Sequence, residues 1–137
     1  MRQSKYDDLF GGPRAPDCPG REILNHVMSR WGVLALLALR DRTHRFSELR
    51  RRIGGVSEKM LAQTLRTLED DGFVLRRDFA EVPPRVEYEL TPIGRQLAKY
   101  VAALATWISD NTANVLAARE KRPRAGARLG STTRPVS

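Results

Sequence analysis

A chain of 137 residues can bury one modest hydrophobic core, so its length predicts a single globular domain. Hydrophobic residues make up 41% of the chain, no apolar run approaches the roughly 20 residues of a membrane helix, and the polar N-terminal residues lack the apolar segment of a signal peptide. These features exclude a membrane protein and lead us to expect a cytoplasmic one. The net charge of +8 would suit a polyanionic partner, but residues 119–137 contribute +5 of it, so charge alone does not make the rest of the chain a DNA binder.

Residue types that carry catalysis or bind metals are scarce. The single cysteine, Cys18, rules out an intrachain disulfide and a multi-cysteine metal site. His26 and His44 have no acid beside them at metal-ligand spacing, and we interpret each as a structural or surface histidine. The chain has no glycine-rich phosphate loop and no nucleophile elbow. The sequence therefore predicts a protein that is not an enzyme and that needs no metal or cofactor.

The N-terminal third begins with an arm and continues into two helices. Residues 1–16 contain two glycines and two prolines, and we expect a flexible arm there. Pro19 favours a helix start, because its missing N–H is not needed at the first helical position. We expect a first helix over about 19–29, and residues 32–41, apolar nearly all round, indicate a short buried central helix. The apolar residues that follow helical spacing after Pro19 are Ile23, Leu24, Val27, Met28 and Trp31.

A short basic helix is expected next. Residues 43–46 leave room only for a turn with one strand bridge. Ser47 is expected to cap the helix that follows, ELRRRI. Leu49 and Ile53 can then face the core, while the arginines at 50–52 remain largely outside.

A second helix follows the glycine turn at residues 54–55. Ser57 is a good N-cap, and Val56 and Leu61 occupy the two positions of a hydrophobic staple. Gly72 can supply the left-handed residue that ends the helix. The short helix, the turn and the capped helix together predict a helix-turn-helix.

The helix behind Ser57 has two unlike faces. At about 100° per residue, three leucines form one buried stripe, and long polar side chains occupy the opposite face. The leucines are Leu61, Leu65 and Leu68, and the polar residues are Lys59, Gln63 and Arg66, with Thr67 at the edge. Such donors and acceptors reach base edges and phosphates in a major groove. The alternative is an ordinary amphipathic helix whose polar face is only solvated.

After Gly72 the apolar pattern changes to a period of two, which predicts a β-hairpin with one buried face. The connection at residues 80–85 contains two prolines, which cannot extend a sheet ladder. We expect one inward-facing set on each strand, namely Phe73, Leu75 and Phe79 on the first, and Val86, Tyr88 and Leu90 on the second.

Three arginines flank the loop of this hairpin. Arg76, Arg77 and Arg85 would suit a wing that contacts the phosphate backbone or the minor groove. The alternative is an ordinary hairpin in which these arginines pair with acids. The candidate acids are Asp78, Glu81 and Glu87.

Thr91 and Pro92 predict the start of a last helix, over about 92–118. A small winged domain has little core left to cover its long apolar stripe, so we expect a second copy of the chain to cover it, together with the first helix. The alternative is that the helix packs on its own domain. The tail at 119–137, with almost no large apolar residue, is expected to be disordered. The stripe consists of Ile93, Leu97, Val101, Leu104, Ile108 and Val115, with Tyr100 and Trp107 alongside.

Several stretches in this order resemble the HxlR-type family of bacterial transcriptional regulators, which are dimeric winged-helix proteins related to the MarR group. The stretches are Cys18-Pro19, Arg30-Trp31-Gly32, RFSELRRRIGGVSEKMLAQTLRTLEDDGFVLR and VPPRVEYELTPIGRQL. The resemblance implies a mainly α fold with a small β-hairpin wing: a winged helix-turn-helix domain over about 17–118 that is dimeric through its N- and C-terminal helices. It does not extend to the arm or to the basic tail.

The resemblance also implies a homodimer that presents two recognition helices to a pseudo-palindromic operator in double-stranded DNA. Half-sites about one helical turn, roughly 34 Å, apart need two copies of so small a reader. The residues expected in the major groove are Ser57, Lys59, Gln63, Arg66 and Thr67. Those expected on the DNA backbone are Arg50, Arg51, Arg76, Arg77 and Arg85. Those expected at the dimer interface are Ile23, Val27, Leu97, Val101, Leu104, Trp107 and Ile108.

Several family members sense oxidants or electrophiles through a cysteine at the position of Cys18. A thiol at a helix N-terminus, near Arg21, should have a stabilised thiolate, although Asp17 acts in the opposite direction. One alternative is a regulator controlled by a noncovalent ligand between the dimer helices, where Trp31, Tyr100 and Trp107 could line a pocket. Another is a winged helix that contacts proteins and does not bind specific DNA.

Overall fold

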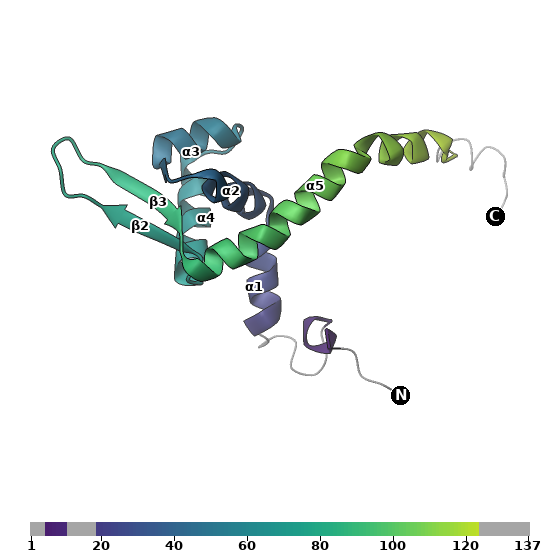
Figure 1. The fold of residues 1–137 in the computed structure, drawn as a ribbon, viewed down its shortest axis with the longest axis horizontal. Helices are drawn as coiled ribbons and strands as arrows, with labels where there is room; N and C mark the ends of the chain where they lie inside the picture. Colours follow the sequence, from purple (N-terminus) through teal and green to yellow (C-terminus); the bar gives the residue numbers. More distant parts are fainter. Residues whose placement is uncertain (1–4, 11–18, 124–137) are drawn as a thin grey trace. The chain divides into compact units, whose positions relative to one another are not determined.

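The computed structural model describes residues 5–10 and 19–123, and helices dominate this part of the chain (Figure 1). A three-stranded sheet accompanies them, so the expected mainly α fold with a small β wing is confirmed. Among the helices of the described residues, none has the length and apolar composition needed to cross a bilayer. The elements are η1 (Asp7–Leu9), α1 (Pro19–Val27), α2 (Arg30–Asp41), β1 (His44–Arg45), α3 (Phe46–Ile53), α4 (Glu58–Asp70), β2 (Val74–Asp78), β3 (Val86–Leu90) and α5 (Pro92–Lys121).

The sheet joins the helix-turn-helix to the wing. Its strand order is β1-β3-β2, and both pairings are antiparallel. The two-residue strand β1 pairs with β3 immediately before α3 begins. On the other edge of β3, β2 completes the hairpin, which extends away from α2, α3 and α4 (Figure 1). Strand β3 therefore fixes the wing and the start of the helix-turn-helix to the same core.

Helix α2 forms the centre of the core. Its side chains Ala35, Leu36 and Leu39 are at most 2% exposed, and it contacts α3, α4 and β3. Ser29 caps it, because the Ser29 hydroxyl oxygen accepts a hydrogen bond from the backbone N–H of Gly32 at 3.1 Å. This cap moves the start of the buried helix to residue 30 and ends α1 at residue 27. The first helix is thus two residues shorter than expected, and Trp31, which continued its apolar spacing, lies in α2.

The start of α3 also differs from expectation. Ser47 does not cap this helix, which begins at Phe46, two residues before its expected start. The backbone N–H of Arg45 donates instead to the side chain of Glu48 at 2.8 Å. This hydrogen bond lowers the pKa of Glu48. The first turn is thus closed by a carboxylate reaching back, which is half of a capping box.

Phe73, the first residue of the expected inward set, precedes β2 and packs partly buried against the core, but the inward face of β2 itself is the opposite of the one expected. Val74, opposite Leu90 in the ladder, is 2% exposed, whereas Leu75 and Phe79 are 40% and 37% exposed. Residues directly opposite each other in an antiparallel pair share a face, so the pairing with Leu90 turns Val74 inward. The assignment for β3 is confirmed at Tyr88 and Leu90, which are both buried.

The chain divides into two compact units, residues 1–102 and 103–137, and α5 runs through the boundary. In the first unit, Ala98 and Val101 of α5 belong to the core. The helix starts very close to the hairpin: a Cβ added at Gly94 would lie 2.0 Å from the carbonyl oxygen of Phe73. In the second unit α5 continues to Lys121, three residues past its expected end. Residues 124–137 of the expected tail, and most of the expected arm, lie outside the described residues.

Candidate nucleic-acid interface

Helix α4 is held from one side only. The Ser57 hydroxyl oxygen accepts a hydrogen bond from the backbone N–H of Met60 at 3.1 Å and caps the helix. Leu61, Leu65 and Leu68 are at most 1% exposed and form its buried stripe. Val56, 4% exposed, packs in the same core ahead of the cap. The cap and the stripe fix both the axis and the rotation of α4, so its outer face has a defined direction.

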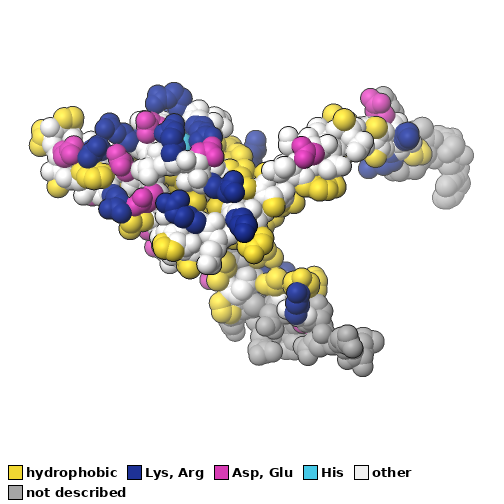
Figure 2. Space-filling model, viewed as in Figure 1, with side chains coloured by type: hydrophobic (Ala, Val, Ile, Leu, Met, Phe, Trp, Pro, Cys, Tyr) yellow, Lys and Arg dark blue, Asp and Glu magenta, His cyan; other side chains and the backbone are white. Residues whose placement is uncertain are grey.

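That outer face is polar, exposed and unpaired. Lys59, Gln63 and Arg66 are exposed, and Thr67 at the edge is half-buried. Within the described residues, none of these first three side chains forms a hydrogen bond or an ion pair. Together with Asp70 they border a shallow open depression along the helix. On the face of residues 19–102 that Figure 2 shows, Lys and Arg side chains are interspersed with acidic ones. The face therefore offers free donors and one amide without an internal partner.

The turn before α4 borders an open groove of about 800 Å³. Arg50, expected on the DNA backbone, holds this turn: its Nε donates to the Val56 carbonyl at 3.2 Å and its Nη1 contacts a Glu58 carboxylate oxygen at 3.3 Å. Arg51 is exposed and has no such partner among the described residues. The groove is lined by Phe46 and Ser47, by both of these arginines and by residues 54–58. The sequence analysis assigned no role to Glu58, although this residue directly follows the expected N-cap.

The wing arginines divide into paired and free ones. Arg85 contacts Glu81 at 3.1 Å and Glu87 at 3.6 Å, and its guanidinium lies 3.9 Å from the centre of the Phe79 ring. Arg77 forms an ion pair with Glu89. For these two the alternative, in which wing arginines pair with acids, describes the structure. Asp78 is not one of those acids, because it accepts from the backbone N–H of residue 80 at 3.0 Å.

Arg76 is the exposed wing arginine without such a contact within the described residues. The sheet holds its backbone opposite Tyr88, and its side chain is nevertheless exposed, although Tyr88 is buried. Among the three wing arginines, Arg76 is therefore the cation that remains available to an external phosphate.

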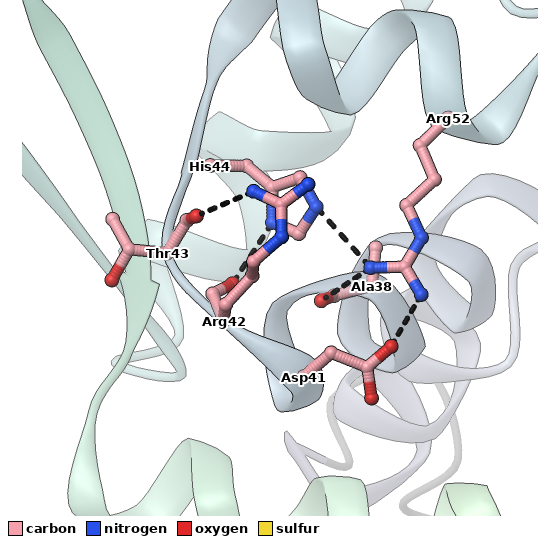
Figure 3. A network of polar contacts seen from close by, with 6 residues as sticks. All are labelled: Ala38, Asp41, Arg42, Thr43, His44 and Arg52. Atoms are coloured by element: carbon pink, nitrogen blue, oxygen red, sulfur yellow. Dashed lines mark hydrogen bonds and ion pairs between the residues drawn. The ribbon is translucent and has the colours of Figure 1, made fainter.

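A polar network around the buried His44 joins the helix-turn-helix to the sheet, and its arginines and Asp41 are exposed (Figure 3). His44 is fully buried; its Nδ1 lies 2.8 Å from the Arg42 carbonyl, and its Nε2 lies 3.3 Å from Nη1 of Arg52. Nδ1 must donate to the carbonyl and Nε2 must accept from the guanidinium, which corresponds to the neutral ring. Burial lowers the pKa of His44. Arg52 also donates to the Ala38 carbonyl at 3.4 Å and pairs with Asp41, whose pKa this hydrogen bond lowers.

The residues expected at the dimer interface differ in exposure. Val27 and Val101 are 5% and 6% exposed and lie in the core of their own chain, and Leu97 packs against that core. These three side chains are already covered, fully or in part, within one chain. The remaining four are exposed, namely Ile23 (38%), Leu104 (45%), Trp107 (58%) and Ile108 (52%). Periodicity alone could not separate the two groups, because both lie on the same helical stripes. Cys18, the expected sensor, lies outside the described residues.

Comparison with known proteins places this geometry in a family. The model of the HxlR-like helix-turn-helix family matches residues 26–115, from the end of α1 to the second unit. The chain belongs to the HxlR-like family. It is 60% identical over 121 residues to the uncharacterized HTH-type transcriptional regulator YtfH of Escherichia coli K12, covering 88% of this chain and 93% of that protein.

Two solved structures are similar to this HxlR-like chain. One, from Salmonella typhimurium, is described as the transcriptional regulator ytfH and is 62% identical, with a TM-score of 0.75 over 81% of this chain and 99% of that one. The other is the redox regulator HypR in its reduced form, 33% identical, with a TM-score of 0.67 over 72% of this chain and 98% of that one. The chain is a transcriptional regulator with a winged helix-turn-helix, and not an enzyme.

Proposed function

We propose that the chain binds double-stranded DNA in a sequence-specific manner, as a homodimer on a pseudo-palindromic operator. The observation that carries this proposal is the outer face of α4, a helix held by buried leucines, where Lys59, Gln63 and Arg66 are exposed and have no partner in the described part of the chain. Gln63 can pair with an adenine edge, and lysine or arginine with a guanine edge. The alternative is an ordinary amphipathic helix whose polar face is only solvated. That alternative does not account for a polar face held in one fixed orientation.

The contacts divide between reading bases and holding phosphates. Gln63 carries base preference, with Lys59 and Arg66 beside it. The Ser57 hydroxyl accepts the capping hydrogen bond and keeps its own proton to donate, and Thr67 borders the face. On the phosphates we propose the unpaired arginines at 51 and 76. The arginines at 50, 77 and 85 are assigned instead to shaping the turn and the wing, because each already contacts an acid.

Two copies are required because a single α4 spans too few base pairs for a palindromic site. Half-sites one turn apart, about 34 Å, need two readers related by a two-fold axis. The surface proposed to join them is the exposed apolar set on α1 and α5. Its members are Ile23, Leu104, Trp107 and Ile108. Covering such side chains contributes roughly 25 cal/mol for each Å² removed from water.

Fluorescence anisotropy against duplexes selected from a random pool tests this function. Wild-type protein should prefer the selected duplex over a scrambled one at every salt concentration. Gln63→Ala should cost about 1–3 kcal/mol on the selected duplex and relax one base position. Arg51→Ala should weaken selected and scrambled DNA alike and reduce the salt slope by about one. Equal affinity of wild-type protein for both duplexes would refute sequence-specific binding.

We also propose that Cys18 senses oxidants or electrophiles. The likeness to the redox regulator HypR supports this, as does the position of the chain's one cysteine directly before the first residue of α1. Signalling would pass through alkylation, a mixed disulfide with a small thiol, or a disulfide to Cys18 of a second copy. Mass spectrometry after diamide or quinone treatment should find a modified Cys18 and released DNA. A Cys18→Ser variant should remain bound to DNA after the same treatment. Release of DNA from the treated variant would exclude the cysteine as the sensor.

A further inference from the structure

Glu58 is an acid at the leading end of the helix that meets DNA. It is the first residue of α4, and its side chain is 74% exposed. One carboxylate oxygen lies 3.3 Å from Nη1 of Arg50, whose Nε donates to the Val56 carbonyl at 3.2 Å. The other oxygen has no hydrogen-bond partner among the described residues. Arg50 thus holds one oxygen of an exposed carboxylate and leaves the other oxygen able to accept a hydrogen bond from outside.

An exposed carboxylate beside phosphates has an electrostatic cost on any DNA. A helix that enters the major groove contacts base edges with its N-terminal residues, so Glu58 and Lys59 arrive there together. A carboxylate only accepts hydrogen bonds, and among major-groove edges it matches the amino group of cytosine. Adenine also presents an amino group, but its N7 acceptor lies next to it and would repel the carboxylate. The cost is therefore offset at a cytosine and at no other base.

We propose that Glu58 is a specificity-determining residue that accepts a hydrogen bond from a cytosine amino group in each half-site, and that Arg50 positions it. This inference rests on the proposed DNA-binding function and adds a second reading residue beside Gln63. It also gives Arg50 a role different from a phosphate contact. The Arg50 guanidinium bridges the turn and the first residue of α4, so it fixes where the free oxygen points.

Two simpler roles for Glu58 can be distinguished from base reading, because they predict different changes in DNA affinity when Glu58 is removed. An acid that only stabilises the helix N-terminus would alter the melting temperature and affect all duplexes equally. An acid that only repels DNA would, once removed, strengthen binding to every duplex equally. A cytosine reader behaves otherwise: its removal strengthens binding to scrambled DNA and weakens binding to the selected duplex.

Substitutions at Glu58 test this on the full-length protein, with duplexes selected by wild-type protein and then varied one base at a time. Wild-type protein should prefer cytosine at one position in each half-site by about 10- to 100-fold, the range expected of a good base contact. Glu58→Ala should abolish that preference and bind scrambled DNA more tightly. Glu58→Gln should shift the preference toward adenine, because an amide matches the adenine edge.

Glu69→Gln is the matched control. It removes the same charge from the same side of α4, 11 residues further on, or about 16 Å along the axis. Glu69 is exposed, and the substitution should leave every base preference unchanged. If Glu69→Gln and Glu58→Gln act alike on all duplexes, only charge matters and the proposal is wrong.

A second pair of variants tests the positioning role of Arg50. Arg50→Lys keeps the charge but loses the planar fork that holds the carbonyl and the acid together. It should relax the preference at the Glu58 position by at least about tenfold and leave the Gln63 position unchanged. The double variant Arg50→Lys with Glu58→Ala should show the same loss of preference at the Glu58 position as Glu58→Ala alone. Arg51→Lys, at the free neighbour, should not alter base preference.

Circular dichroism of each variant confirms that a change in preference comes from a folded protein. Wild-type protein without any base preference would refute both this inference and the proposed function. Wild-type protein with a preference that the Glu58 variants leave intact would refute the inference alone.

Discussion

Helices α4 and α5 both carry apolar stripes, but only one stripe is covered by its own chain. On α4, Leu65 is 1% exposed. On the second-unit part of α5, Leu104 and Trp107 are 45% and 58% exposed. Arginines on the wing show the same contrast, since Arg85 is paired with acids and Arg76 has no partner among the residues that the structure describes. Apolar and charged side chains that are covered or paired within the chain stabilise the fold. We expect external partners at the side chains that the chain leaves exposed and unpaired.

This contrast implies two kinds of stability. Side chains covered by their own chain contribute to a free energy of unfolding that does not depend on protein concentration. Side chains covered by a second copy contribute to a free energy that does depend on it. Substitutions in the two stripes should therefore respond differently to dilution.

The largest effect is expected from Leu65→Ala. Removing a fully buried leucine from the contact of α4 with the core should lower the free energy of unfolding by about 2–5 kcal/mol. Urea unfolding at two protein concentrations measures this, and the difference from wild type should be the same at both. The exposed Leu75 is the matched control, and Leu75→Ala should cost less than about 1 kcal/mol. A smaller loss for Leu65→Ala than for Leu75→Ala would contradict the assigned core.

Leu104→Ala should have the next largest effect, on association. Because the side chain is half-exposed in one chain and counts twice in a symmetric dimer, we expect a loss of about 1–3 kcal/mol in dimerisation free energy, or roughly 5- to 150-fold in dissociation constant. Sedimentation equilibrium measures it. Lys99→Ala, on the same helix but on another side, should leave the dissociation constant unchanged. Equal association of Leu104→Ala and wild type would place the interface elsewhere.

Acidification should weaken the contacts of the buried His44. Burial holds its pKa below the value of about 6.5 that the unfolded chain has, so the unfolded state binds more protons below that pH. The free energy of unfolding should thus fall as the pH drops from about 6.5 through the lowered folded pKa, by less than Leu65→Ala costs. Urea titrations across this range measure the loss. In His44→Gln, less stable at neutral pH, this decline should shrink, and an undiminished decline would assign it to other groups.

The smallest effect separates the free wing arginine from a paired one. Arg76→Ala should reduce the slope of log affinity against log salt by about one, because one phosphate contact is lost. Arg85→Ala removes a guanidinium that already contacts two acids, so the slope should change less. Anisotropy titrations over a salt series measure both slopes. A larger change for Arg85→Ala would show that its ion pairs open on DNA.

Local signals were enough to predict the helix-turn-helix. Ser57 was expected as the cap of α4, and the leucine spacing gave its buried face, because both depend on residues within a few turns of each other. The start of α3 was missed for a local reason as well. Ser47 and the Glu48 carboxylate were competing ways to close the same turn, and the carboxylate formed the hydrogen bond.

Features that depend on strand register could not be predicted from the sequence. Val74 and Leu75 are both apolar, so alternation alone did not tell which faces inward; the pairing of Val74 with Leu90 decides it. The same holds for Arg77 and Arg85, whose acidic partners come from across the hairpin and from its loop. Nor does a periodic stripe tell which of its residues the chain itself covers, as Val101 and Leu104 show.

Changing the spacing between half-sites tests the central claim, that two copies joined through α1 and α5 present two α4 helices to one face of DNA. In a duplex selected by the wild-type protein, inserting half a helical turn, about 5 base pairs, moves the second half-site to the opposite face. Anisotropy should then show an affinity reduced to that of a single half-site, partly regained when about 10 base pairs are inserted. Unchanged affinity after the half-turn insertion would contradict the joined pair of readers.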